Sequence, residues 1–252
     1  MKTVLLIGIG AGDPEHITVQ AINALNRAQV FFILDKGYAD DELLRLRTEI
    51  CQRYITAPGY RIVVVHDPQR KADPLSYQRG VERWHEQRAV LFERLIDEEL
   101  RPDETGGFLV WGDPSLYDST LRILERVLSR GAIAFDYQVI PGISSVQALA
   151  AQHRIPLNRI GEPIQITTGR RLALDEGANV DNTVVMLDAH SAFEGFLGRG
   201  LHIYWGAYLG TDHEILIAGE LDEVCEHIKH VRQKARQDRG WIMDAYLLRK
   251  LD

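Results

Sequence analysis

Short apolar runs alternate with helical patterns along the first half of the chain. Residues 4–9 and 30–34 are apolar almost without interruption, and residues 18–28 between them carry apolar side chains at helical spacing. A strand that is covered on both faces gives such an unbroken run, whereas a strand with one face in solvent alternates apolar and polar residues. The order of strand, helix and strand therefore predicts a parallel sheet.

The pattern changes after residue 140, where strands become more frequent than helices. In the first half, further strands are predicted at 61–65, 108–111 and 132–140, and further helices over 40–54, 74–100 and 116–128. In the second half, strands are predicted at 164–168, 183–187, 202–208, 214–219 and 241–248, and helices over 146–151, 191–198 and 221–236. We therefore expect an α/β fold with a parallel-sheet N-terminal domain over residues 1–138 and a mixed-sheet C-terminal domain over residues 139–252.

Composition excludes several classes of function. The chain has 252 residues, of which 45% are apolar and 26% charged, as in an ordinary soluble protein of two modest domains. Its formal charge of −7 argues against a nucleic-acid-binding surface. Cys51 and Cys225 are far apart and suggest neither a disulfide framework nor a metal site, so we expect a reducing, cytoplasmic location and no bound metal. No apolar run is long enough for a membrane span.

Glycine-rich or polar turns follow four of the predicted strands in the first half. The turns are GIGAGDP at residues 8–14, DKG at 35–37, GDPSLYDST at 112–120 and IPGISS at 140–145. Each turn alone also suits an ordinary capped connection between strand and helix. In a parallel sheet, however, all four lie at the carboxyl edge, where open α/β sheets bind ligands. Together they predict a binding site at that edge.

The first of these turns does not match the common nucleotide-binding motifs. The dinucleotide fingerprint requires a third small residue at the position of Asp13, and no Gly-Lys-Ser/Thr follows that would make a phosphate-binding loop. Dehydrogenase, kinase and GTPase functions therefore lose their main support. In the turn after the fourth predicted strand, Gly112 lets a ligand approach the main chain and Pro114 suits a first helical turn.

Three of these segments together resemble a known family of enzymes. GIGAGDP at 8–14, GDPSLYDST at 112–120 and VIPGISSVQALAA at 139–151 are similar to the signature blocks of the tetrapyrrole (corrin and porphyrin) methyltransferases, the class III S-adenosylmethionine enzymes. The resemblance continues through HRIPL at 153–157 and weakens after residue 168. It implies a two-domain α/β protein, normally a homodimer, with S-adenosylmethionine as methyl donor, S-adenosylhomocysteine as product, and an active-site cleft between the domains.

The resemblance also implies which residues bind the donor. In the first two thirds of the chain they belong to two turns: Gly112, Asp113, Pro114, Tyr117, Ser119, Thr120, Pro141, Gly142, Ser144 and Ser145. In the second domain they lie at predicted strand ends: Met186, Leu187, Gly206, Ala207, Ala218 and Gly219. Local chemistry agrees for the first turn, because a donor with a purine and a ribose needs main-chain groups, hydroxyls and an apolar wall.

Within the family, residues 67–100, with YQRGVERWHEQRA at 77–89, most resemble the members that methylate C-1 of precorrin-5 and release acetate. Methyl transfer mainly requires that the reactants be positioned, whereas removal of an acetyl group benefits from a base and an oxyanion donor. Candidate catalytic residues are Asp35, His66 and Tyr117. Asp35 is equally consistent with a helix-capping carboxylate, and a lone His66 with a structural residue at a strand end.

A tetrapyrrole carries many carboxylates, so an acidic protein needs a local basic rim to bind one. On the substrate side we expect Gly10, Gly12 and Asp13 of the first turn, Lys36, and the pair Arg170 and Arg171 in a predicted turn at 169–171. The pool of basic residues also includes Arg70, Lys71, Arg79, Arg83 and Arg154. For Arg79 and Arg83, which share one helix face, a purely solvated role is at least as consistent.

Other functions stay open at this point. The chain is compatible with a precorrin methylase that acts at a different ring carbon, or with a diphthamide-type or ribosomal-RNA methylase that shares the first-domain segments. From a different class, a non-catalytic sensor of adenosyl ligands would keep the fold without turnover. We rank the sensor last, because the substrate-side turns keep polar residues that a sensor does not need.

Overall fold

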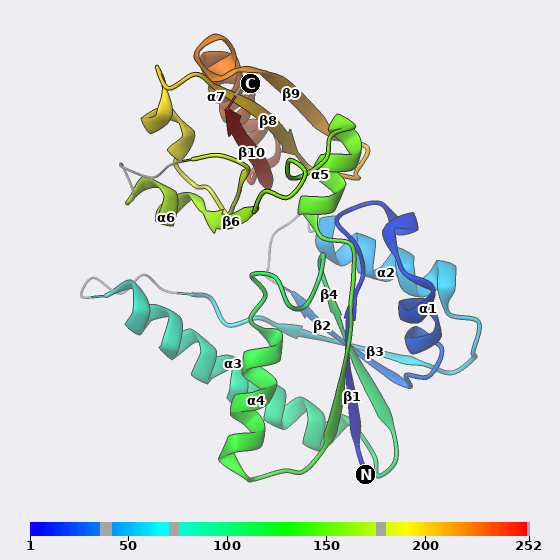
Figure 1. The fold of residues 1–252 in the computed structure, drawn as a ribbon. Coiled ribbons are helices and arrows are strands. Elements are labelled where there is room, and N and C mark those ends of the chain that lie inside the picture. The colour runs from blue at the N-terminus through cyan, green and yellow to red at the C-terminus, as the bar shows by residue number, and fades with distance from the viewer. Residues whose placement is uncertain (36–41, 71–75, 175–179, 251–252) are drawn as a thin grey trace. The chain divides into compact units, whose positions relative to one another are not determined.

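The computed structural model describes residues 1–35, 42–70, 76–174 and 180–250. The chain forms two compact units, Met1–Ser144 and Ser145–Asp252 (Figure 1). The division lies later than the boundary predicted between residues 138 and 139. The reason is that β5 (Asp136–Ile140) pairs with β1 along its length, so the whole strand and the turn after it remain with the first unit.

A five-stranded parallel sheet forms the centre of the first unit, as predicted. Its strands are β1 (Thr3–Gly8), β2 (Val30–Asp35), β3 (Arg61–His66), β4 (Thr105–Val110) and β5, in the order β3-β2-β4-β1-β5. Neighbouring strands run parallel throughout this order. Their carboxyl ends therefore share one edge of the sheet.

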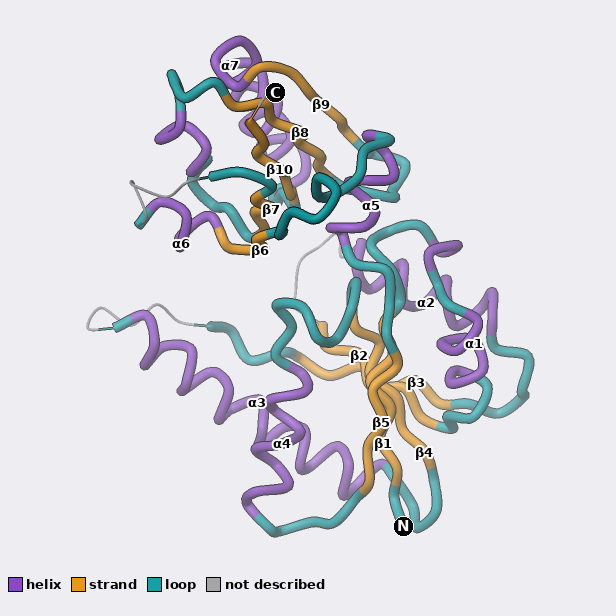
Figure 2. Tube along the Cα trace, in the orientation of Figure 1, coloured by secondary structure: helices purple, strands orange, loops and turns teal. Residues whose placement is uncertain are grey.

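Helices cover both faces of this sheet (Figure 2). They are η1 (Pro14–His16), α1 (Val19–Leu25), α2 (Glu42–Tyr54), α3 (Tyr77–Glu99) and α4 (Thr120–Arg130). Leu5 packs with residues of α1 and α2, whereas its neighbour Leu6 packs with residues of α3 and α4. Because successive strand residues point to opposite faces, both must be apolar. This two-sided burial explains the unbroken apolar run of β1.

The second unit contains a five-stranded mixed sheet, which is also as predicted. Its strands are β6 (Gln165–Thr168), β7 (Thr183–Met186), β8 (Leu201–Ala207), β9 (Ile215–Glu220) and β10 (Asp244–Lys250), in the order β6-β7-β10-β8-β9. β6 and β7 are parallel, and the other described pairs are antiparallel. Its helices are α5 (Ser145–His153), α6 (Gly169–Ala173), η2 (Ala192–Phe196) and α7 (Leu221–Arg239).

One local prediction for the second unit is wrong. Residues 169–171 were expected to form a turn, but they begin the short helix α6. Thr168 explains the difference, because its hydroxyl oxygen accepts a hydrogen bond from the main-chain N–H of Arg171 at 3.3 Å and caps the helix. Arg170 and Arg171 are both exposed on this helix.

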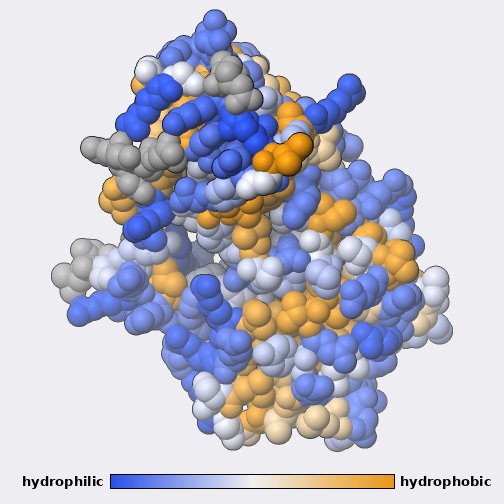
Figure 3. Space-filling model, in the orientation of Figure 1, coloured by the Kyte–Doolittle hydropathy of each residue, from blue (hydrophilic) through white to orange (hydrophobic). Residues whose placement is uncertain are grey.

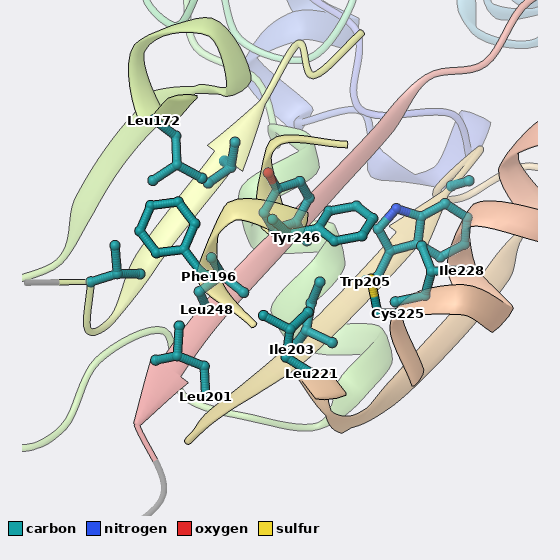
Figure 4. Close-up of a cluster of buried hydrophobic side chains, with 14 of the residues drawn as sticks. Leu172, Phe196, Leu201, Ile203, Trp205, Leu221, Cys225, Ile228, Tyr246 and Leu248 are labelled. Atoms are coloured by element: carbon teal, nitrogen blue, oxygen red, sulfur yellow. The ribbon is translucent and has the colours of Figure 1, made fainter. Parts of the chain in front are cut away.

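The core of the second unit lies between its sheet and α7. Figure 4 shows Trp205 of β8 beside Cys225 and Ile228 of α7, and all three are buried. Tyr246 of β10 belongs to the same cluster.

On the surface, exposed apolar side chains form several groups among hydrophilic ones in the view of Figure 3. Among the described helices, none combines the length and apolar character that a membrane crossing requires.

Candidate active site

The turns that follow β1, β4 and β5 meet at one point of the first unit. The main-chain N–H of Gly112 donates to the carbonyl oxygen of Gly10 at 2.8 Å, which forms an isolated antiparallel bridge. A Cβ atom on Gly142 would lie well under 3.0 Å from the carbonyl oxygen of Gly112, and one on Gly8 would lie 2.6 Å from the nitrogen of Gly142. Only glycine permits this approach of three main chains.

Asp113 fastens two of these turns together. Its carboxylate accepts a hydrogen bond from the N–H of Gly142 at 2.8 Å, and others from the N–H of Ser115 at 2.8 Å and the Ser115 hydroxyl. Partial burial alone would raise the pKa of Asp113, but the hydrogen bonds from Ser115 and Gly142 outweigh it and hold the pKa below its ordinary value. The carboxylate therefore stabilises the junction as an anion.

The remainder of the turn after β4 presents Tyr117 to solvent. Pro114 and Thr120 are buried, whereas Tyr117 is 45% exposed and has a φ of +52°. A left-handed conformation is unfavourable for a tyrosine and persists where surrounding contacts impose it. Here Asp118 supplies one such contact, because its carboxylate accepts from the N–H of Thr120 at 2.6 Å. Partial burial of the side chain raises the pKa of Tyr117.

The structure also explains what Ser119 does. Ser119 precedes α4 but makes no capping hydrogen bond to that helix. Instead, its hydroxyl oxygen accepts a hydrogen bond from the Arg88 guanidinium at 2.9 Å. Arg88 was missed in the sequence, although a signal exists: it lies four residues from both Trp84 and Phe92, on the apolar stripe of α3, where a charged residue is unexpected.

Two of the three catalytic candidates lie side by side. Asp35 ends β2 and His66 ends β3, and the two residues are direct partners in the register of the strands. The N–H of Asp67 donates to the carbonyl oxygen of Asp35 at 2.7 Å, which continues the pairing past His66. Asp35 is half-buried and His66 is exposed. Tyr117 follows β4, the strand on the other side of β2.

The predicted substrate-side residues fall into three groups. Asp13 caps η1, because its carboxylate accepts from the N–H of Glu15 at 2.7 Å. Gly10 and Gly12 are buried in the same turn. Lys36 lies outside the described residues. Arg170 and Arg171 are on α6 in the second unit, and their contacts with a substrate stay predictions.

The second unit places the predicted donor residues at strand ends and on its sheet edge. Met186 ends β7, and Leu187 after it is 60% exposed with a φ of +53°. Gly206 packs closely, since a Cβ there would lie 2.9 Å from the Leu149 side chain, and Ala207 is fully buried. Both could reach a ligand only through main-chain groups. Ala218 and Gly219 lie on β9, the edge strand, and all these donor contacts stay predictions.

A buried polar network holds the turn that contains Leu187. Arg232 of α7 donates to the carboxylate of Asp244 at 2.7 Å, to the Ser191 hydroxyl at 2.6 Å and to the carbonyl oxygen of Asp188. The Asp188 carboxylate in turn accepts from the hydroxyl of Tyr246 at 2.7 Å. These side chains connect α7 and β10 to the segment after β7, which fixes the conformation of that segment.

The turn after β5 completes the site of the first unit. Ser144 is buried, and its Cα would lie 3.6 Å from a Cβ on Gly112, which is an ordinary van der Waals distance, so Ser144 lies directly against Gly112. Pro141 is exposed and Ser145 begins α5. Among residues 1–35, 42–70, 76–174 and 180–250, no group of three His, Cys, Asp or Glu side chains lies close enough to hold a metal ion.

Comparison with known proteins identifies this architecture. The model of the tetrapyrrole (corrin/porphyrin) methylases matches residues 3–225. A precorrin-6A synthase [deacetylating] from Sinorhizobium sp. is 53% identical over 250 residues, which cover 99% of this chain and 96% of that protein.

Solved structures agree. A putative cobalamin synthesis related protein (CobF) from Corynebacterium diphtheriae superposes with a TM-score of 0.86 at 43% identity, over 100% of both chains. A uroporphyrin-III C-methyl transferase from Thermus thermophilus, complexed with S-adenyl homocysteine, shares the fold at 18% identity, with a TM-score of 0.58 over 98% of this chain and 97% of that one. The predicted two-domain fold is therefore confirmed, and because the family match spans most of both units, this chain belongs to the tetrapyrrole methylase family.

Proposed function

We propose that this chain is an S-adenosylmethionine-dependent C-methyltransferase of cobalamin biosynthesis that methylates C-1 of precorrin-5 and releases acetate. The observation that carries the proposal is the 53% identity, over nearly the whole of both chains, to a precorrin-6A synthase [deacetylating]. The segment at 77–89 that most resembles such enzymes in the sequence forms the first half of α3, against which the turn after β4 is held.

The first unit fits the donor on three counts. The turns after β4 and β5 bring main-chain groups of Gly112 and Gly142 together. Tyr117 supplies a hydroxyl group, and Pro141 is an exposed apolar ring in the turn after β5. When bound, S-adenosylmethionine supplies a methyl group that positively charged sulfur activates toward displacement. The task of these residues is to hold and orient it.

The strand ends of β2 and β3 suit the acetyl-releasing step. In this step the oxygen of water attacks the acetyl carbonyl and a base takes the proton of the water. The bond between acetyl and ring then breaks, acetate leaves, and the electron pair stays on the macrocycle as an enamine carbon that accepts the methyl group. We assign the base to His66, an imidazole being suited to proton transfer near neutral pH. Asp35, its register partner, would orient or charge-stabilise it, and Tyr117 is a donor for the developing oxyanion.

Product analysis tests the function directly. Purified protein is incubated with precorrin-5 and S-adenosylmethionine carrying a labelled methyl group, and products are followed by mass spectrometry and by NMR of acetate. We expect one acetate for each methylated corrinoid. A product that gains the methyl and keeps the acetyl group would indicate a methylase that acts at another position. Binding of S-adenosylhomocysteine without turnover of any tetrapyrrole would indicate a sensor.

We also propose a homodimer, which the family resemblance supports, in a reducing cytoplasm, which the free cysteines Cys51 and Cys225 favour. Sedimentation equilibrium at micromolar concentration measures the oligomeric state, and a mass of one chain under those conditions would contradict the dimer.

A further inference from the structure

One buried guanidinium connects two turns at the carboxyl edge of the first sheet. Arg88 of α3 is 6% exposed, and its Nε lies 2.9 Å from the carboxylate of Asp67, which is also buried. Its terminal nitrogen donates to the Ser119 hydroxyl at 2.9 Å. Asp67 follows β3 and Ser119 precedes α4, so a single side chain reaches the segments after β3 and β4.

The surroundings of Arg88 fix its orientation. Its guanidinium lies over the ring of Trp84, 4.7 Å from the centroid, and 5.3 Å from that of Phe92. The indole N–H of Trp84 donates to the carbonyl oxygen of Pro68 at 2.7 Å, which ties the same helix to the segment after β3. Burial lowers the pKa of Arg88 while the charge of Asp67 opposes that effect, and a guanidinium stays protonated in either case. A planar group held in this way has little freedom to reorient.

Different contacts hold the two halves of the turn after β4. Its first half is held by the Gly112–Gly10 bridge and by the bond between Asp113 and Gly142, neither of which involves Arg88. Its second half is held at Ser119 by Arg88, and the carboxylate of Asp118 accepts from the N–H of Thr120. Tyr117 lies in the second half, in the left-handed conformation. The contacts that hold the segment of Tyr117 are therefore different from those that hold the junction at which we place the donor.

The other end of the link lies next to a second catalytic candidate. Asp67 directly follows His66, the proposed base, and its N–H continues the pairing to Asp35. The ion pair of Arg88 with Asp67 and its hydrogen bond to Ser119 thus connect the segments that carry His66 and Tyr117. Elsewhere, α3 and α4 are joined by exposed ion pairs of Arg130 with Glu86 and Glu93, which do not reach these turns.

We propose that Arg88 is a positioning residue that holds His66 and Tyr117 in a fixed relation on the tetrapyrrole side, without contributing to donor binding. The inference rests on the proposed function and deepens it. A displacement of about 1 Å in a reacting group can lower a rate about a hundredfold, so loss of either contact should reduce turnover strongly.

Two variants separate positioning from stability. Arg88→Met removes both links but leaves Asp67 buried without its partner, so it can also lower stability. Ser119→Ala removes only the link to the turn after β4 and keeps the ion pair with Asp67. Arg130→Met is the matched control, because it breaks contacts between the same two helices at the surface. Each variant is assayed for kcat and KM with precorrin-5, and for the Kd of S-adenosylhomocysteine by calorimetry.

We expect Ser119→Ala to lower kcat at least tenfold, with the Kd of S-adenosylhomocysteine within threefold of wild type, and Arg88→Met to lower kcat further. Arg130→Met should match wild type in all three constants. Combined with Tyr117→Phe, Ser119→Ala should add less than its separate effect, because both changes act on the same group. Full additivity would overturn positioning through Tyr117.

Other outcomes decide between the remaining explanations. A wild-type kcat for Ser119→Ala would overturn the inference, and a tenfold weaker Kd for S-adenosylhomocysteine would show instead that Ser119 binds the donor. Wild-type protein that turns over no precorrin-5 would overturn the proposed function together with the inference. Turnover by wild type and by Ser119→Ala alike would overturn the inference alone.

Discussion

A methyl group at Gly142 should pull apart the junction on which the candidate site depends. The Cβ atom of Gly142→Ala would lie well under 3.0 Å from the carbonyl oxygen of Gly112 and 2.9 Å from two main-chain atoms of Gly8. All of these neighbours are main-chain atoms, so no flexible side chain can move aside. The turns after β1, β4 and β5 must separate to accommodate the new atom.

The cost follows from two contributions. Overpacking of a well-packed region costs about 1–3 kcal/mol. Displacement of the Gly142 nitrogen also breaks its 2.8 Å hydrogen bond to the Asp113 carboxylate, and a bond to a charged group contributes about 1.5–3 kcal/mol. Because Asp113 is only partly buried, we take the lower end for this bond. The expected loss in the free energy of unfolding is about 3 kcal/mol.

Donor binding should weaken as well. If half of that lost free energy is also lost from the binding of S-adenosylhomocysteine, its Kd rises about tenfold, since 1.4 kcal/mol corresponds to a factor of ten. Urea unfolding gives the stability, calorimetry gives the Kd, and hydrogen exchange of the amides in residues 3–16 and 105–120 localises the change to the junction.

Gly195→Ala provides the control for this experiment. A Cβ on Gly195 would meet no atom within 4 Å, so this variant should stay within about 0.5 kcal/mol of wild type. Gly142→Ala with wild-type stability and an unchanged Kd would refute the close approach of the three turns. Lost stability with an unchanged Kd would refute only the placement of the donor at the junction.

Three further predictions concern ionisable side chains. Arg232→Met should destabilise the second unit by about 3–5 kcal/mol in urea unfolding, because it leaves the Asp244 carboxylate buried without its cationic partner; a loss below 1 kcal/mol would contradict this. The pKa of Asp113 is lowered by folding, so its contribution to stability is complete above the ordinary value of 3.8 and is lost as pH falls through the lowered pKa. Acid titration of stability should show this loss in wild type and not in Asp113→Asn. His66→Ala should lower acetate release about a hundredfold with an unchanged Kd for S-adenosylhomocysteine, and equal loss of both would place His66 at the donor.

Hydrophobic patterning was sufficient to predict both sheets. Leu5 and Leu6 illustrate the reason: neighbours on a strand can both be buried only if both faces of the sheet are covered, and such double coverage is typical of a parallel sheet with crossover helices. Short elements were harder to predict. The helix α6 has five residues and depends on one capping bond from Thr168, which apolar spacing cannot reveal. The fifth strand was predicted to begin at residue 132, but β5 begins at Asp136. Residues 132–135 form a connection after Gly131, which caps α4.

The positions of the site turns could be predicted from the sequence, but their internal contacts could not. Strand order and turn composition placed the polar turns at one edge of the sheet. The bond between Asp113 and Gly142 joins residues 29 positions apart, and that between Arg88 and Ser119 joins residues 31 positions apart. Such contacts depend on strand register and side-chain direction, which spacing along the chain does not encode.

These internal contacts change how the two ligands are distinguished. Asp113 and Ser119 were both expected to face the donor. In the structure, however, the Asp113 carboxylate accepts hydrogen bonds from main-chain N–H groups, and the Ser119 hydroxyl oxygen accepts one from Arg88. We therefore expect recognition of the donor in the first unit to depend mainly on main-chain groups near Gly112 and Gly142, which side-chain substitution leaves in place. The two side chains that we place on the tetrapyrrole side, His66 and Tyr117, lie on segments that Arg88 of α3 connects. We therefore expect changes on the buried face of α3 to alter the choice and turnover of the tetrapyrrole before they alter affinity for the donor.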